Sequence, residues 1–121
     1  MTQQQPLRDA DLAAFTGSEH WYRHGLTGML YTDGAKYVAE TAGAYWLLDE
    51  IAIAQCFDKR LAREEFQVWN LSIRPDQRAT LSCDDGNDNI VFSKDLEFTD
   101  FPEPGIKLYF SGNTIYLPSE Y

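Results

Sequence analysis

The longest apolar stretch of the chain is Ala44-Tyr-Trp-Leu-Leu-Asp-Glu-Ile-Ala-Ile-Ala-Gln-Cys-Phe57. Its apolar residues recur with the spacing of one face of an α-helix, at Ala44, Leu47, Leu48, Ile51 and Ala54. Trp46, Ile53 and Phe57 widen this face. A helix with so few polar positions must be covered on most of its sides. The stretch therefore predicts the central core helix of the protein, around which the rest of the chain is interpreted.

Length and composition fit one folded unit. The chain has 121 residues, of which 44% are hydrophobic and 14% aromatic, so it can bury a substantial core. We interpret residues 1–121 as a single domain, with residues 1–6 as a flexible end because they are short and polar.

The segments before the core helix predict short elements. Residues 9–15 read as a helix, and about 19–24 and 28–32 as two short strands joined by a glycine-containing turn. Residues 35–41 predict a helix with Asp33 as its N-cap, and Gly43 separates it from the core helix or kinks it there.

The segments after residue 65 predict strands. Residues 66–74 alternate in a way that suits a strand, and Asp84–Asn89 is rich in residues that favour turns. Further strands are expected at residues 79–83, from 90 onward with a continuation over 96–101, and at 106–110 and 114–117. Helices first and hairpins afterwards predict an α+β fold, with N-terminal helices packed on one face of a C-terminal antiparallel sheet.

Charge and hydropathy restrict the classes of partner and the cellular location that we expect for this protein. The chain has 19 acidic and 10 basic residues, a net charge of −9, which disfavours direct contact with nucleic acid or an anionic membrane. There is neither an apolar run of about 20 residues nor a signal peptide at the start, so a cytoplasmic location is expected. Cys56 and Cys83 are then reduced thiols, and Cys56 on the core helix is predicted to be buried.

Acidic residues concentrate in the last third of the chain. Residues 84–121 hold 8 acidic residues and 2 lysines, against 11 acidic and 8 basic residues in 1–83. Carboxylates spaced along a sheet imitate a phosphate backbone and attract a basic partner. The predicted partner-binding residues are Asp84, Asp85, Asp88, Asp95, Glu97, Asp100 and Glu103. The alternative is a surface that serves solubility alone.

A second group of residues suggests a pocket beside the core helix. His20 and His24 flank Trp21, and Asp49 and Glu50 are polar positions on an apolar helix. Paired carboxylates act as acid and base when their environments differ, but adjacent helical residues diverge by about 100°. The alternatives are partly exposed histidines and a narrow solvated stripe. A zinc site needs three or four converging ligands, and the spacing does not predict one.

No sequence motif for catalysis is present. The chain lacks a phosphate-binding loop, a nucleophile elbow, a dinucleotide-binding glycine pattern and a His-Glu-x-x-His zinc motif. We therefore predict no catalytic residue and no cofactor. A homo-oligomer, formed by an exposed strand edge that pairs with a second copy, is a further possibility.

Three segments resemble one protein family. They are Thr32-Asp-Gly-Ala-Lys-Tyr37, Ala44-Tyr-Trp-Leu-Leu-Asp-Glu-Ile51 and Ile115-Tyr-Leu-Pro-Ser-Glu-Tyr121. They are similar to an uncharacterised family of small bacterial proteins found on phages, plasmids and other mobile elements, and the resemblance spans about Phe15 to Tyr121. It transfers no catalytic residue. It implies an inhibitor of the anti-CRISPR or anti-restriction type, which occupies the basic nucleic-acid surface of a host protein.

Overall fold

The computed structural model describes residues 7–16 and 20–121, so the predicted flexible end at 1–6 lies outside the described residues. The helices are α1 (Asp9–Ala13), α2 (Asp33–Thr41), α3 (Tyr45–Phe57), α4 (Lys59–Ala62) and the 3-10 helix η1 (Pro118–Glu120). The strands are β1 (Trp21–Arg23), β2 (Leu30–Thr32), β3 (Phe66–Ile73), β4 (Ala79–Asp84), β5 (Ile90–Leu96), β6 (Gly105–Ser111) and β7 (Thr114–Tyr116).

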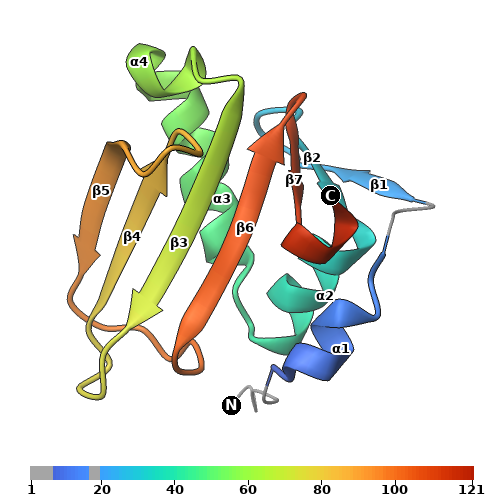
Figure 1. The fold of residues 1–121 in the computed structure, drawn as a ribbon, viewed down its shortest axis with the longest axis vertical. Coiled ribbons are helices and arrows are strands. Elements are labelled where there is room, and N and C mark those ends of the chain that lie inside the picture. The colour runs from blue at the N-terminus through green and yellow to red at the C-terminus, as the bar shows by residue number, and fades with distance from the viewer. Residues whose placement is uncertain (1–6, 17–19) are drawn as a thin grey trace.

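The strands form one seven-stranded sheet in the order β1-β2-β7-β6-β3-β4-β5 (Figure 1). The α+β class is confirmed, but the sheet is neither purely antiparallel nor purely C-terminal. Strand β2 pairs in parallel with β7, with Tyr31 opposite Ile115. The N-terminal hairpin therefore extends a sheet whose other pairs are antiparallel. No local sequence pattern predicts the pairing of β2 with β7, because these two strands lie far apart in the sequence.

Helix α3 packs behind the sheet and forms the predicted core helix (Figure 1). Leu47, Leu48 and Ile51 are at most 2% exposed. Eight of its 13 residues are buried or half-buried, so most sides of the helix are covered, as expected. One stripe stays open to solvent, on which Ile53 is 44% and Phe57 84% exposed.

Strand β3 lies inside the sheet and shows the predicted alternation. Gln67, Trp69, Leu71 and Ile73 point into the core and are buried. Gln67 Nε2 donates to Gln55 Oε1, and Gln55 Nε2 donates back to Gln67 Oε1. Gln67 Oε1 also accepts from Trp69 Nε1 at 3.0 Å. This satisfied network allows a polar side chain to lie fully buried beneath the sheet.

Several local predictions need correction. Thr32 caps α2 by accepting from the Ala35 amide, while Asp33 lies in the first turn and accepts from the Tyr22 hydroxyl. Of the two arrangements expected around Gly43, the structure has two separate helices, with Gly43 between α2 and α3 at a φ of 61°. Cys56 is exposed, because it falls on the uncovered part of α3.

The predicted continuation of a strand over residues 96–101 is absent, since β5 ends at Leu96. In the part of the chain that the structure describes, no helix has the length and apolarity needed to cross a membrane.

Candidate functional site

Strand β5 is a long, open edge of the sheet. It pairs with β4 and lies at the left margin of the sheet in Figure 1. None of its residues is buried. Among residues 7–16 and 20–121, no further strand pairs with it, so one row of its backbone N–H and C=O groups faces outward. An exposed strand edge is the backbone surface on which another chain can pair.

Carboxylates of the predicted acidic surface lie before the start of β5. Asp84 is 8% exposed and accepts from the Gly86 amide at 2.8 Å, so it does not contribute to an exposed surface. Hydrogen bonds from the Asn89 side chain and then the Asn87 amide lower the pKa of Asp85. Asp88 is exposed at a positive φ of 64°. The predicted turn therefore uses two of its aspartates to hold its own shape.

The remaining predicted carboxylates lie at the end of β5, where Asp95 is the last residue but one, or in the segment that follows it. Asp95, Glu97, Asp100 and Glu103 are all exposed, and Asp95 accepts from the Thr80 hydroxyl at 3.0 Å. Seven strand residues span about 20 Å, which separates this group from Asp88. Asp88 thus lies at one end of the β5 edge and Asp95, Glu97 and Asp100 at the other, whereas Glu103 lies beside β6, so the acidic residues do not form a single patch.

Arginines moderate the charge at one of these ends. Arg74 and Arg78, from the turn between β3 and β4, line a cavity together with Asp95, Leu96 and Glu97. The acidic excess that the sequence shows after residue 83 is therefore partly offset in space by basic residues from an earlier segment. Asp88, Asp100 and Glu103 do not line this cavity.

Apolar side chains accompany the edge on its helix side. A cavity of about 290 Å³ between α3 and β5 is lined by Ile53, Ala54, Phe57 and Phe92, with Glu50, Asp58 and Lys94. A second cavity of about 280 Å³ is lined by Trp46, Leu96, Phe98, Thr99 and Asp100. Lys94 Nζ binds both Glu50 carboxylate oxygens at 3.0 Å. The β5 edge thus combines unpaired backbone, two shallow hollows and charge.

The structure brings together only part of the predicted pocket. His24 is 8% exposed, and its Nε2 lies 2.6 Å from Asp49 Oδ1. His20 is exposed and lies 3.8 Å from an Asp33 oxygen, while Glu50 turns away to Lys94. Trp21 is 57% exposed on β1. The two carboxylates of α3 thus have separate partners, as their divergence on the helix predicts.

Thr27 completes a short chain of polar contacts with His24 and Asp49. Its amide donates to His24 Nδ1 at 3.3 Å, and its hydroxyl oxygen lies 3.0 Å from the same atom. Because Nδ1 accepts from this amide, the Nε2–H of the neutral ring points toward Asp49. The Thr27 hydroxyl also accepts from the Met29 amide, so these contacts close the turn between β1 and β2.

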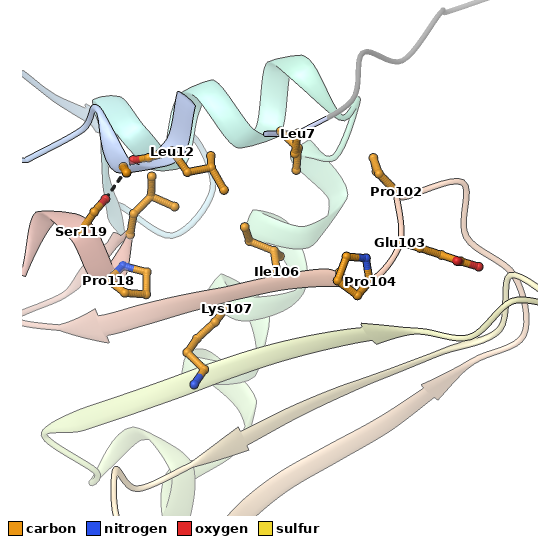
Figure 2. Close-up of a pocket in the computed structure, with 12 residues that line it drawn as sticks. Leu7, Leu12, Pro102, Glu103, Pro104, Ile106, Lys107, Pro118 and Ser119 are labelled. Carbon is orange, nitrogen blue, oxygen red and sulfur yellow. Dashed lines mark hydrogen bonds between the residues drawn. The ribbon is translucent and has the colours of Figure 1, made fainter. Parts of the chain in front are cut away.

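An apolar cleft that the sequence did not indicate lies beside β6 (Figure 2). It has a volume of about 340 Å³, and Leu7 and Leu12 approach Ile106 across it. Glu103 and Lys107 extend away from these side chains in Figure 2. The charged groups at its rim are therefore not directed at its interior. Of the residues that line this cleft, only Glu103 belongs to a site predicted from the sequence.

Metal binding and thiol chemistry find little support in the described residues. Within residues 7–16 and 20–121, no three His, Cys, Asp or Glu side chains gather closely enough to hold a metal ion. Cys83 is fully buried, and burial raises the pKa of its thiol to about 12. It is a structural residue rather than a nucleophile.

Comparison with known proteins places the chain in a family without assigning an activity. No curated protein and no solved structure matches it. One family model matches residues 7–121, which include every described helix and strand, and it is described as a family of unknown function (DUF6876). The chain belongs to this DUF6876 family of unknown function.

Proposed function

We propose that the protein is a small non-enzymatic binding protein that uses its acidic β5 side to occupy a basic surface of a partner protein. The observation that carries this proposal is the placement of exposed carboxylates at both ends of the open β5 edge, with Asp88 at one end and Glu97 and Asp100 at the other. Acidic fields of this kind accelerate and orient association with basic partners.

The partner class follows from the charge. A host enzyme that binds nucleic acid presents the basic groove that spaced carboxylates match. In this proposal the protein acts in the cytoplasm as an inhibitor carried by a phage, plasmid or other mobile element, of the anti-CRISPR or anti-restriction type. The sequence resemblance supports this setting by analogy.

The test is affinity capture from a host lysate at about 0.15 M salt and again near 0.5 M, where surface charges are screened more strongly. We expect a basic nucleic-acid-binding protein to be retained at low salt and released at high salt. Glu97→Lys should abolish this retention. Asp11→Lys, which reverses an exposed charge on α1, is the matched control and should leave it intact. Unchanged capture by the Glu97→Lys variant would contradict the proposal.

The second candidate is an enzyme or small-ligand protein that uses the region of His20, Trp21, His24, Asp49 and Glu50. The observation that favours it is the 2.6 Å contact between His24 and Asp49. Trp21 lines a further cavity of about 360 Å³ with Tyr116 and Tyr121, and Glu50 lines the cavity between α3 and β5. Neither His24 nor Asp49 lines any of these cavities. A ligand that shifts the His24 ring resonances in NMR, and that binds more weakly to the His24→Gln variant, would favour this candidate.

A further inference from the structure

The β5 edge has the features of a site for strand addition, and this inference rests on the proposed binding function. The edge is seven residues long, exposed, and unpaired on its outer side in the described part of the chain. Main-chain hydrogen bonds to such an edge give affinity, whereas hollows beside it read alternate side chains of the added strand.

The hollows lie on one side of the edge. The register with β4 places Phe92 opposite Cys83 and Leu96 opposite Ala79. Cys83 and Ala79 are buried on the helix side of the sheet, so Phe92 and Leu96 point to the same side. Side chains alternate along a strand, so Lys94 also points to the helix side, where it lines the first cavity and donates to Glu50. An added strand would set its helix-side side chains over these hollows. Asp95 points to the opposite face, where Thr80 donates to it.

Several large apolar side chains beside the β5 edge are exposed to solvent instead of packing into the core. Phe57 is 84% and Phe98 71% exposed, and each lines one of the two hollows, whereas Ile90, which is 59% exposed, pairs with Asp84 on the opposite face. Scattered exposed apolar residues are normal, but exposed aromatic residues in hollows beside an unpaired strand mark an interaction surface. The apolar groups match alternate apolar side chains of an incoming segment.

Charge decides between a second copy and a different protein. Antiparallel pairing of β5 with its own copy would bring the Asp88 end of one chain against the Glu97 end of the other. Both ends are acidic, and each chain carries a net charge of −9, so this pairing is repulsive. A segment with lysine or arginine at its ends meets opposite charges at the same positions.

We infer that β5 accepts an extended segment of a partner protein as an additional strand, with apolar side chains at alternate positions and basic residues at both ends. The segment would place its apolar side chains over the Ile53–Phe57 and Trp46–Phe98 hollows. Its basic ends would meet Asp88 on one side and Glu97 and Asp100 on the other.

The probe is a synthetic peptide, Lys-Lys-Ile-Thr-Ile-Thr-Ile-Lys-Lys, with Lys-Thr-Lys-Ile-Ile-Ile-Lys-Thr-Lys as a control of the same composition. Binding to the full chain is followed by NMR through amide shifts and hydrogen exchange. We expect the alternating peptide to slow exchange of β5 amides and to bind about tenfold more tightly than the control, since only it can place a row of apolar side chains.

Two N-methylated peptides test the backbone pairing itself. Neighbouring amides of a strand point in opposite directions, so methylating all isoleucine amides or all threonine amides blocks opposite edges. Strand addition predicts that one of the two loses binding and the other keeps it. Equal binding of both would overturn the inference, because contact through charge alone does not depend on which edge is blocked.

Protein variants locate the hollow. Phe57→Ser should weaken the alternating peptide about five- to tenfold, as expected for loss of an aromatic contact. Leu26→Ser removes an apolar side chain that is 89% exposed in the β1–β2 turn and should change nothing. Salt-sensitive binding with shifts at Asp88, Glu97 and Asp100, but without slowed exchange of the β5 amides, would overturn strand addition and leave the acidic binding function standing. No binding by either peptide would overturn strand addition, whereas the acidic binding function is decided by the capture experiment.

Discussion

Strands β3 and β5 belong to the same sheet and are separated only by β4, yet they differ in how far the core buries their side chains. Every second residue of β3 is buried, from Gln67 to Ile73, and none of β5 is. The core therefore accounts for the pattern of β3. On β5, Val91, Phe92 and Leu96 are half-buried against the core, whereas Ile90 is 59% exposed and the core does not account for it. Residues that the fold does not need are the ones available to a partner.

The largest expected effect is at the centre of the sheet. Trp69 is 1% exposed and packs against Phe92 at a ring distance of 5.3 Å. Trp69→Ala should lower the free energy of unfolding by about 4 kcal/mol, because it leaves a large cavity. Urea unfolding followed by circular dichroism measures this. A loss below about 1 kcal/mol would show that β3 is as dispensable to the core as β5.

Gln67 tests whether the centre also depends on polar contacts. Gln67→Leu keeps the approximate volume but removes the partner of Gln55 and of Trp69 Nε1. We expect a loss of about 2 kcal/mol, since these groups stay buried without partners. The same unfolding measurement applies. A neutral or stabilising result would mean that an apolar residue serves equally well at this position.

Substitution of the two cysteines compares the stability contributed by a buried residue of an inner strand with that of an exposed residue on α3. Cys83→Ala should cost about 1 kcal/mol at neutral pH, and Cys56→Ala close to none, because only Cys83 is buried. Burial raises the pKa of Cys83 from 9.0 to about 12, so its contribution is complete below pH 9 and is lost as the pH rises toward 12.

Thermal unfolding between pH 8 and about 11 checks this sign. The wild-type protein and Cys56→Ala should lose stability over this range, and Cys83→Ala should lose less. A thiol reagent at pH 8 should label Cys56 in the native protein and Cys83 only after unfolding. Equal labelling of both in the native state would contradict the buried position of Cys83.

The smallest expected effect is at the edge. Ile90→Thr on β5 should change the free energy of unfolding by no more than about 0.5 kcal/mol, because the side chain is 59% exposed. The same change should weaken a partner that pairs with β5. A loss above about 1.5 kcal/mol in urea unfolding would remove the distinction between centre and edge.

Local signals determined most of the elements. The helical spacing from Leu47 to Ala54, the alternation from Gln67 to Ile73 and the Asp84–Asn89 turn each act over a few residues, so the sequence alone located them. The same reasoning misplaced the cap of α2 by one residue, because Thr32 and Asp33 are both good caps and the pairing of β2 decides between them.

Only the tertiary structure decided which surfaces are open. The parallel pairing of β2 with β7, the contact of His24 with Asp49 and the approach of Arg74 and Arg78 to Asp95 join segments that are distant in the chain. The burial of Asp84 and the exposure of Cys56 and Phe57 follow from where the sheet ends. The spacing of apolar residues in the sequence determines which face of each helix or strand is apolar. Whether that face is buried depends on which distant segments of the chain pack against it.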